Sequence, residues 1–473
     1  MKELKWASAP CVPRKDYNRY YEPHICRLAP AEHSFSLEWF DNGSDGGHTL
    51  YYRLRESDDE WVAVPLTERC ATVEGLTNDV DYVIYIERND KSAKSHTRLI
   101  NPCSPPGVVI NYVHPDEDYF DFAGIYPASP SIVKLPSGNL LSTHDIFGFG
   151  NGLGMGFVYI SRDGGESWQY QTEINPLHWA TPFVVGERLY LFGCYGESGD
   201  FVISESLDEG KTWSEPTVLM RTDKKNKEAN LHRGPVPIIQ HNGRIYTCFE
   251  IGAWASRGEH GFEHSILSAS VDSDLMNMDS WEHTPFGTVP QDKFLDENST
   301  ADYVVAIEGN AVAGPDGNIY NMLRLDPMTN EVREGSIGLN NACVLFRLKN
   351  FDEPLEFVGK VDAPVGMRCK FFVQRDESTG LYFLLGNERA PRNVNNRRSL
   401  ITLAVSSDLK NWRKLSEVLD CTDIDKHGIG YVTFCFDGED IIFVSRTAWG
   451  KLKDEHDNNT ITFHRIKNYK SML

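Results

Sequence analysis

Two octapeptides decide the fold: Ser161-Arg-Asp-Gly-Gly-Glu-Ser-Trp168 and Ser206-Leu-Asp-Glu-Gly-Lys-Thr-Trp213. Both fit the pattern S-x-D-x-G-x-x-W, and a version one residue shorter occurs at Ser406-Ser-Asp-Leu-Lys-Asn-Trp412. In such a segment the aspartate accepts backbone N–H groups, the glycine takes a positive φ, and the tryptophan packs beneath the turn. We therefore assign these residues to the turns of repeated hairpins and expect no catalytic role for them.

The repeated octapeptides lie in a chain of short β-rich runs separated by turn signals. The 473 residues include 38 glycines and 24 prolines, and aromatic residues make up 11% of the chain. No long stretch shows the period of an amphipathic helix, so the pattern predicts an all-β protein.

The octapeptide is the Asp box, or BNR repeat, and the chain resembles the sialidase superfamily of β-propellers over roughly residues 108 to 473. The repeats set the phase of the blades at steps of about 50 to 75 residues, which suits four-stranded blades. We expect six blades, or seven if the long segment 240–300 contains another. The predicted inner strands are Ser129–Val133, Thr181–Val185, Gly234–Ile239, Glu308–Ala313, Lys370–Gln374 and Tyr431–Phe436.

The first hundred residues resemble a fibronectin type III β-sandwich with Trp39 in its core. Leu76 precedes Tyr82 by six residues, the spacing of a tyrosine corner whose hydroxyl bonds back to the backbone. The proline-rich run Asn101-Pro-Cys-Ser-Pro-Pro-Gly107 predicts a stiff linker. We place the domains at 1–103 and 104–473, and expect Val108-Val-Ile-Asn-Tyr-Val113 to supply the outer strand that closes the last blade.

Composition excludes several functional classes. With 47 Lys and Arg against 68 Asp and Glu, the net charge is −21, which opposes binding to a nucleic acid. We find no membrane-spanning stretch and no signal peptide, so we expect a soluble protein, either cytoplasmic or exported with its signal removed. The ten scattered cysteines indicate neither a disulfide scaffold nor a zinc site. No motif indicates a cofactor or a metal, and nothing indicates an oligomeric state.

The resemblance implies an active site at the mouth of the central channel. In sialidases a glutamate precedes an arginine by sixteen residues across a hairpin, and Glu308 and Arg324 reproduce that spacing. The tyrosine nucleophile of the superfamily corresponds to Tyr431, and a second arginine to Arg398, eight residues before the shortened repeat. A carboxylate base such as Glu308 can activate a tyrosine, and nearby arginines lower its pKa.

Two sialidase features are missing from the first blade. Tyr126-Pro-Ala-Ser-Pro stands where the first arginine of a three-arginine clamp is expected, and only Asn151 is available where the acid/base aspartate belongs. The same blade contains the run Ser142-Thr-His144-Asp145 instead. We expect His144 to face the channel mouth and transfer protons, because histidine titrates near neutral pH.

Further polar residues are candidates for substrate binding. Because the chain is acidic overall, an anionic substrate needs a local cationic cluster, for which we propose Arg324, Arg398, Arg368 and Lys370. His178 and Arg233 open two inner strands, and Asn310 follows Glu308 by two residues. Arg233 and Asp145 are also candidates to replace the missing arginine and aspartate of a sialidase.

Three segments point to a branch of the superfamily near ulvan lyases and propeller rhamnosidases. They are Ser-Thr-His-Asp-Ile-Phe-Gly from Ser142, Glu-Gly-Asn-Ala-Val from Glu308, and the ending His456-Asp-Asn-Asn-Thr-Ile-Thr-Phe-His464. The resemblance implies an enzyme that cleaves a glycosidic bond at or next to an acidic sugar, a uronate, by hydrolysis or by β-elimination. His144, Tyr431 and Glu308 would be its catalytic groups. The alternatives are an exo-α-sialidase and a non-enzymatic glycan-binding propeller.

Overall fold

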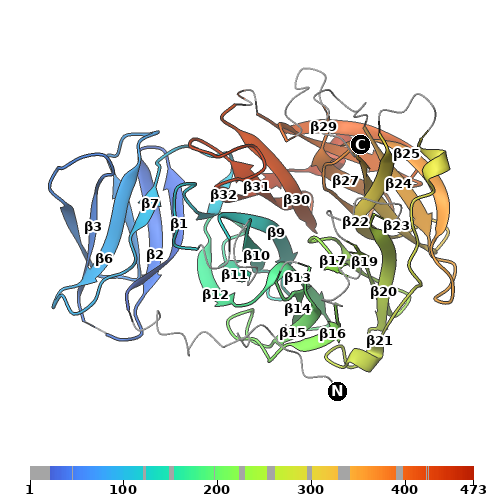
Figure 1. Cartoon of the computed structure of the whole chain (residues 1–473), viewed down its shortest axis with the longest axis horizontal. Coiled ribbons are helices and arrows are strands. Elements are labelled where there is room, and N and C mark those ends of the chain that lie inside the picture. Colours follow the sequence, from blue (N-terminus) through green and yellow to red (C-terminus); the bar gives the residue numbers. More distant parts are fainter. Residues whose placement is uncertain are drawn as a thin grey trace.

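The computed structural model describes residues 22–44, 46–120, 124–148, 154–196, 198–222, 230–252, 261–295, 301–328, 341–389, 398–421, 423 and 425–473. Asn151 lies outside these residues. Nearly all the regular structure is antiparallel β-sheet: two sheets form an N-terminal unit, and six more form a ring beside it (Figure 1). The helices among the described residues are short, and none has the length and apolar character needed to cross a membrane.

The N-terminal unit, called the sandwich unit below, consists of two sheets. One contains β1 (His24–Ala31), β2 (Ser34–Phe40) and β5 (Cys70–Glu74); the other contains β4 (Val62–Leu66), β3 (His48–Leu54), β6 (Tyr82–Arg88) and β7 (Arg98–Ile100).

Alternate residues of β2 face the core of this unit, and Trp39 is buried there as predicted. The hydroxyl of Tyr82 accepts a hydrogen bond from the backbone N–H of Thr77 at 3.0 Å, which confirms the predicted tyrosine tie. The assignment to the fibronectin type III family stays a prediction.

The ring has the sialidase-like propeller architecture, and its sheets follow one another along the chain. The first sheet contains β9 (Tyr126–Lys134), β10 (Leu140–Phe147), β11 (Met155–Ser161) and β12 (Gln169–Ile174). The second contains β13 (His178–Val185), β14 (Arg188–Cys194), β15 (Phe201–Ser206) and β16 (Thr217–Met220). The third contains β17 (Leu231–His232), β18 (Ile238–His241), β19 (Arg244–Ile251), β20 (Glu263–Ser270) and β21 (Trp281–His283). The fourth sheet contains β22 (Tyr303–Ala313), β23 (Ile319–Met328), β24 (Asn341–Arg347) and β25 (Glu356–Gly366). The fifth contains β26 (Phe371–Arg375), β27 (Tyr382–Asn387), β28 (Leu400–Ser406) and β29 (Trp412–Asp420). The sixth contains β30 (Gly428–Asp437), β31 (Asp440–Ala448), β32 (Thr460–Ile466) and β8 (Val108–Tyr112).

The first strand of each sheet lies innermost, since β9 contacts both β30 and β13, and β26 contacts both β22 and β30. One predicted inner strand is only partly formed. Residues 233–237 leave the ladder between β17 and β18, because Pro235 and Pro237 have no N–H to donate to a neighbouring strand. Within the described part of segment 240–300, the strands all belong to this one sheet.

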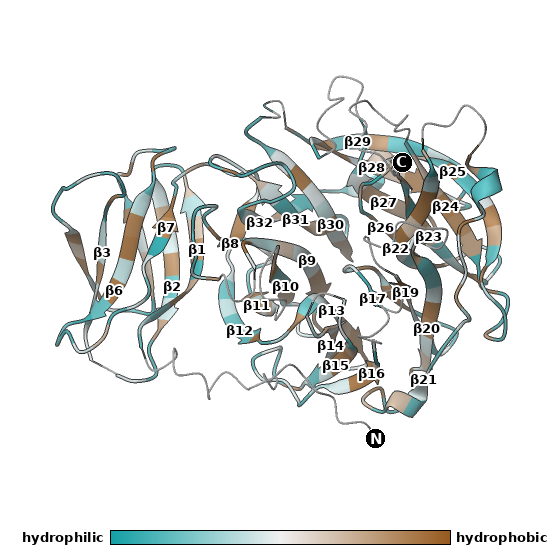
Figure 2. Cartoon of the chain, viewed as in Figure 1, coloured by the Kyte–Doolittle hydropathy of each residue, from teal (hydrophilic) through white to brown (hydrophobic). Residues whose placement is uncertain are grey.

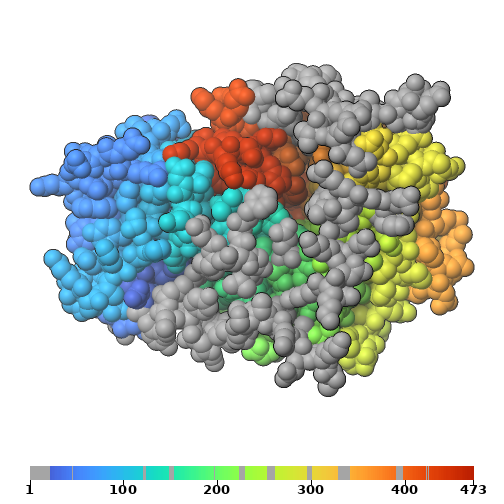
Figure 3. Space-filling model, in the orientation of Figure 1, coloured from blue at the N-terminus to red at the C-terminus, as the bar shows by residue number. Residues whose placement is uncertain are grey.

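The ring closes through a strand from the start of the propeller. β8 pairs antiparallel with β32, and Thr460 lies opposite Tyr112. This confirms that Val108–Val113 supplies the outer strand of the last sheet. The same strand meets the sandwich unit, because Arg27 of β1 donates to the carbonyls of Val109 and Ile110 at 2.9 and 2.8 Å. Figure 3 shows the sandwich unit in blue against the residues that follow it.

The repeated turns have the hydrogen bonds predicted from their sequence. Asp163 accepts from the backbone N–H of Ser167 at 2.9 Å, and Asp208 accepts from Thr212 at 2.8 Å. In the shortened repeat, Leu409 takes the positive φ in place of a glycine, and its N–H donates to Ser406 Oγ at 3.0 Å. The apolar residues form clusters between neighbouring sheets, where the strands are mostly brown in Figure 2.

Candidate active site

Four inner strands contain the same irregularity. Each has a bulge whose first residue takes a positive φ close to 50°: Ser129 in β9, Trp179 in β13, Glu308 in β22 and Tyr431 in β30. A positive φ is strained for a residue other than glycine, and bulges re-aim side chains and gather near active sites. Two of the four positions hold the predicted catalytic residues Glu308 and Tyr431.

The bulge of β22 supports a buried carboxylate–arginine cluster. Arg324 lies on β23 opposite Ile307, and its Nη1 donates to Glu308 Oε2 at 2.5 Å. The same guanidinium donates from Nε and Nη2 to the two carboxylate oxygens of Asp326, each at 3.1 Å. Burial acts to raise the pKa of Glu308, but Arg324 and Lys370 hold that pKa below its ordinary value. Glu308 is therefore ionised at neutral pH.

The bulge of β30 presents the phenol of Tyr431 to two arginines. Arg446 lies opposite Gly430 on β31, and its guanidinium carbon is 3.8 Å from the centroid of the Tyr431 ring. Arg398 donates from Nη2 to the Tyr431 hydroxyl at 3.2 Å. Burial acts to raise the pKa of Tyr431, but Arg398, Arg324 and Arg446 together bring it below its ordinary value. The phenol is thus poised to lose its proton.

A histidine and an aspartate complete this group. His456 Nε2 is 3.1 Å from the Tyr431 hydroxyl, and His456 Nδ1 is 2.8 Å from Asp457 Oδ1. Because an ionised carboxylate only accepts hydrogen bonds, Nδ1 carries the proton and Nε2 accepts one from the phenol. Burial, with help from Arg446 and Arg398, lowers the pKa of His456 to about 4. We call Tyr431, His456 and Asp457 the relay.

Three of the four predicted cations, Lys370, Arg324 and Arg398, lie close together beside the relay, and a place for Arg368 in this cluster stays a prediction. Lys370 is almost fully buried, donates to the carbonyl of Val432 at 3.0 Å, and lies within electrostatic range of Glu308, Arg324 and Arg446. Burial lowers the pKa of Lys370 to about 7. Arg324 and Arg398 are also buried and influence each other. An anionic group would therefore find several cations close together.

A second buried pair, His232 and Glu250, contacts the bulge that carries Glu308. His232 Nδ1 is 2.9 Å from Glu250 Oε2, and Glu250 Oε1 accepts from the backbone N–H of Gly309 at 3.0 Å. His232 lowers the pKa of Glu308 through space, and Glu308 in turn acts to raise that of Tyr431, so the three groups are electrostatically coupled. Among the described residues, His232 Nε2 has no hydrogen-bond partner.

Two predicted substrate-binding residues make structural contacts. Asn310 Nδ2 donates to the carbonyls of Glu308 and Met322, each at 3.2 Å, and Asn310 Oδ1 accepts from Val373 N–H at 3.0 Å. The side chain thereby holds the bulge against the next sheet. The buried guanidinium of Arg233 reaches hydroxyls and a carbonyl in the second and third sheets; its acceptors are Thr181 Oγ1, Thr247 Oγ1 and Val236 O. Contacts of these residues with substrate stay predictions.

The predicted orientation of His144 is wrong. Its side chain is stacked against the rings of Phe157 and Tyr159, and its Nε2 is 3.1 Å from Asn111 Nδ2 of β8. His144 lies opposite the bulge of β9, so strand alternation turns it away from its neighbour Asp145. Burial lowers its pKa to about 4. The sequence motif was visible, but it did not tell which face of the strand the histidine occupies.

Asp145 and His178 lie together between the first two sheets. His178 Nδ1 is 3.6 Å from Asp145 Oδ2, which also accepts from the backbone N–H of Trp179 at 2.6 Å. Within the described part of the chain, Asp145 Oδ1 and both nitrogens of His178 are buried without a hydrogen-bond partner. Because these atoms are buried, the role of both residues in substrate binding stays a prediction.

Two groups of side chains have ligand atoms within 4.8 Å of one another: Asp81, His114 and Asp116, and Asp454, His456 and Asp457. In the first group, Lys451 Nζ lies 2.7 Å from both aspartates, where a metal ion would otherwise sit. In the second, the histidine is hydrogen-bonded within the relay. We assign no metal to either group.

Sequence reasoning gave no role to several residues of this site, among them Arg446, Glu250 and His456. Arg446 pairs opposite Gly430 as Arg324 pairs opposite Ile307, and superposing the two hairpins in sequence would have revealed it. Glu250 could have been found in the same way, since it pairs opposite His232. His456 lies in the loop between β31 and β32, and only the tertiary fold brings it to Tyr431.

Comparisons with known proteins agree with the architecture. No protein-family model matches the sequence, and no curated protein matches it. A Hadza microbial sialidase has a similar structure, with a TM-score of 0.51, 12% identity, and coverage of 98% of this chain and 96% of that one. A GH93 α-L-arabinofuranosidase of Fusarium graminearum, in complex with arabinobiose, gives a TM-score of 0.50 at 12% identity, covering 75% of this chain and 96% of that one.

A Trypanosoma rangeli sialidase in complex with the inhibitor DANA also gives a TM-score of 0.50, at 14% identity. It covers 82% of this chain, which spans 58% of the length of that protein. The protein therefore has the sialidase-like β-propeller fold.

Proposed function

We propose that the protein is a glycosidase that cleaves a glycosidic bond at or next to an acidic sugar. The observation that carries this proposal is the position of the Tyr431 hydroxyl, between His456 Nε2 and the guanidinium of Arg398. A nucleophile hydrogen-bonded to a base, which is itself oriented by a third group, is the general arrangement of an activated nucleophile.

In the hydrolytic reaction, the Tyr431 oxygen attacks the anomeric carbon. The new bond forms as the glycosidic C–O bond breaks, and the phenolic proton passes to His456 Nε2. Asp457 orients the imidazole and stabilises the imidazolium. A water molecule then cleaves the glycosyl–tyrosine bond, and the phenolate recovers its proton from His456. The low pKa of His456 keeps it neutral, and so able to accept the proton, at neutral pH.

The leaving oxygen requires a proton from a second group, and we assign this role to His232. Its Nδ1 is held by Glu250, which also contacts the bulge that carries Glu308, and its Nε2 is unpaired among the described residues. As an imidazolium it donates to the leaving group, and as an imidazole it accepts from the incoming water. Glu308 is paired with Arg324 and ionised, so it stabilises positive charge at the anomeric carbon and does not serve as the acid.

The cationic cluster supports an acidic substrate. Arg398 and Arg446 both lie against Tyr431, and among the described residues no carboxylate lies within hydrogen-bond distance of the Arg446 guanidinium. A guanidinium without a carboxylate partner can bind one from the substrate. This is the local cluster that a protein with a net charge of −21 needs to attract an anion.

A uronate lyase is the second candidate, and the lowered pKa of Tyr431 favours it. In β-elimination a phenolate removes the proton at C5, the bond to the leaving oxygen at C4 breaks, and a cation stabilises the charge on the carboxylate. The relay and the arginines fit those needs as well. The names of the structural neighbours support hydrolysis, and two of them are sialidases, which keeps the exo-sialidase alternative.

A panel of glycans ending in uronates, sialic acids and arabinofuranose tests these proposals. New reducing ends without ultraviolet absorbance indicate hydrolysis, absorbance from an unsaturated uronate indicates elimination, and free sialic acid indicates a sialidase. Either activity should fall sharply in His456→Gln and His232→Gln. Binding without turnover of any glycan would contradict the proposal and support a glycan-binding protein.

A further inference from the structure

The loop between β31 and β32, residues 449–459, links two distant parts of the molecule. Near its end it carries His456 and Asp457 of the relay, and near its start it carries Lys451, which reaches the sandwich unit. The inference drawn from this loop rests on the proposed role of the relay.

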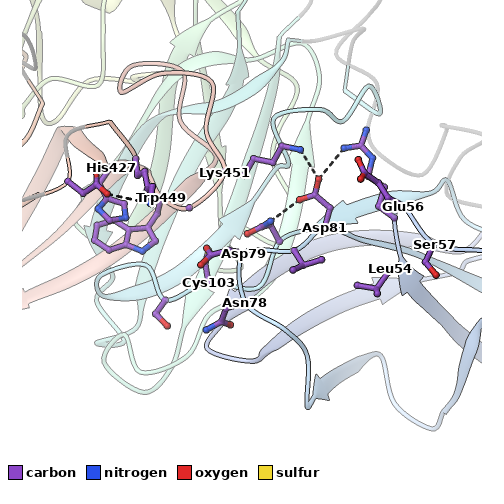
Figure 4. Close-up of a pocket in the computed structure, with 17 residues that line it drawn as sticks. Leu54, Glu56, Ser57, Asn78, Asp79, Asp81, Cys103, His427, Trp449 and Lys451 are labelled. Atoms are coloured by element: carbon purple, nitrogen blue, oxygen red, sulfur yellow. Dashed lines mark hydrogen bonds and ion pairs between the residues drawn. The ribbon is translucent and has the colours of Figure 1, made fainter. Parts of the chain in front are cut away.

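Lys451 joins a cluster of charges where the two units meet. Its Nζ is 2.7 Å from Asp81 Oδ2 of the sandwich unit and 2.7 Å from Asp116 Oδ2, which lies after β8. Arg55 bridges the same two carboxylates at 3.2 and 2.6 Å. Asp81 also accepts from Asn101 Nδ2 at 2.8 Å. Figure 4 shows Lys451 directed toward Asp81 from the opposite unit. We call Lys451, Asp81 and Asp116 the clasp.

Within the loop, short hydrogen bonds restrain both the segment that carries Lys451 and the segment that carries His456. Asn459 Nδ2 donates to the carbonyls of Trp449 and Lys451, each at 2.7 Å, and closes the base of the loop. Asp454 Oδ1 accepts from the backbone N–H groups of His456 and Asp457 at 2.7 and 2.6 Å. A loop restrained in this way moves largely as one body, so the position of Lys451 affects that of His456.

Apolar packing is sparse on the sandwich side of this loop. A cavity of about 910 Å³ separates the units there, lined by Leu54 and Asp79 on one side and His427, Trp449 and Lys451 on the other (Figure 4). Trp449 is stacked on His427 of its own sheet, with ring centroids 3.5 Å apart. The charged contacts of the clasp therefore join the two units at the edge of this cavity.

We propose that the sandwich unit is a positioning element of the active site, and that the clasp holds His456 in hydrogen-bond distance of Tyr431. Lys451, Asp81 and Asp116 are positioning residues, because they act through the loop and do not touch the reacting atoms. Misplacing a catalytic group by about 1 Å costs on the order of 100-fold in rate.

The protonation of His456 gives a direct readout of its position. The groups that face its ring come from three strands, from the segment before β28 and from the loop itself: Tyr126 of β9, Tyr431 of β30, Arg446 of β31, Arg398, and Asp457. Burial among them lowers the pKa of His456 to about 4. If the loop moves toward solvent, that pKa rises toward the ordinary histidine value of about 6.5.

Lys451→Met tests the proposal, with Lys451→Arg as the rescue variant and Lys470→Met as the control. Lys470 pairs with Glu439 at 3.2 Å elsewhere on the last sheet and has no bond to the loop. We expect Lys451→Met to lower kcat about 10- to 100-fold with KM within about threefold, and to move the acid limb of the kcat–pH profile upward by about 1 to 2 pH units. Lys451→Arg should restore most of kcat, and Lys470→Met should match the wild type.

The variants Asp81→Asn and Asp116→Asn test the same contact from the other side. Each leaves Lys451 one carboxylate, so smaller shifts in the same direction are expected even if Lys451→Met does not fold. Wild-type kcat and pH profile in both, or in Lys451→Met, would overturn the clasp. His456→Gln distinguishes a failure of the relay from a failure of the clasp. If this variant keeps wild-type activity, the proposed role of the relay is wrong, whatever the clasp variants show.

Discussion

The fourth and sixth sheets of the propeller have the same bulge in their inner strands, but the residues at the two bulges have different chemical roles. In both, a bulge on the inner strand turns a residue to a φ of 53° or 54°, and an arginine lies across the hairpin from the residue before it. In the fourth sheet this arginine, Arg324, contacts two carboxylates. In the sixth sheet the corresponding Arg446 lies against the ring of Tyr431.

The difference shows that charge pairing, more than backbone geometry, decides what each bulge does. Arg324 is neutralised by Glu308 and Asp326, so the fourth sheet contributes a stable ionised cluster. Arg446 keeps its charge for Tyr431 and lowers the pKa of that phenol. The fourth sheet thus provides a fixed electrostatic background, and the sixth provides the group that reacts.

The largest expected effect comes from removing the reactive group of the sixth sheet. Tyr431→Phe should lower kcat by about 10³- to 10⁴-fold, because it removes the oxygen that forms the covalent bond or takes the proton. The free energy of unfolding should change little, since the ring remains between the arginines. Tyr85→Phe, in the sandwich unit, is the matched control. If kcat of Tyr431→Phe falls by less than tenfold, the relay is not part of the mechanism.

The two arginines should differ in how much they contribute to stability. Arg324→Met leaves Glu308 and Asp326 buried without their partner, and we expect it to lower the free energy of unfolding by about 3 to 5 kcal/mol. Arg446→Met leaves no buried carboxylate unpaired, so its effect on unfolding should be smaller, but it should raise the pKa of Tyr431. Chemical denaturation and spectrophotometric titration of the phenol measure the two effects. Equal losses of stability would contradict the comparison.

Acid should destabilise the fourth sheet by protonating Glu308. The folded-state pKa of Glu308 is lowered by Arg324, so its ionisation stabilises the fold above the unfolded glutamate pKa of about 4.3, and this stabilisation is lost as pH falls through the folded value. Tm measured from pH 7 down to pH 3 should therefore fall less steeply in Glu308→Gln than in the wild type, from a lower starting Tm. Parallel curves for the two proteins would show that Glu308 has no lowered pKa.

The fold was largely predictable because its signals are local and repeated. The turn residues, such as Asp163 and Asp208, are set by hydrogen bonds within a few positions, and short β-rich runs between the turns set the strands. The closing strand β8 was predictable because a ring needs one more strand at its last sheet. The missed gap between β17 and β18 follows from Pro235 and Pro237, whose meaning depended on the sheet they interrupt.

The site was predictable only where its residues lie on the hairpins themselves. Glu308, Arg324 and Tyr431 have fixed positions in the repeated register, and the structure brings them together. His144 was misplaced because a one-residue shift in a strand exchanges its two faces, and a bulge causes such a shift. His456 comes from a loop, whose path depends on contacts as distant in sequence as Asp81.

The smallest expected effect concerns the bulge of β9, which has the same φ but bears a serine. Ser129 acts to lower the pKa of Asp145, which lies across the hairpin where the other two sheets have an arginine. Ser129→Ala removes a hydroxyl that stabilises this buried carboxylate, so we expect the free energy of unfolding to fall by about 1 to 2 kcal/mol. Because this substitution leaves the backbone of the bulge unchanged, kcat should stay within about threefold of the wild-type value. A loss as large as that of Tyr431→Phe would mean that the first sheet takes part in the reaction, and that the division between background and reactive sheets is wrong.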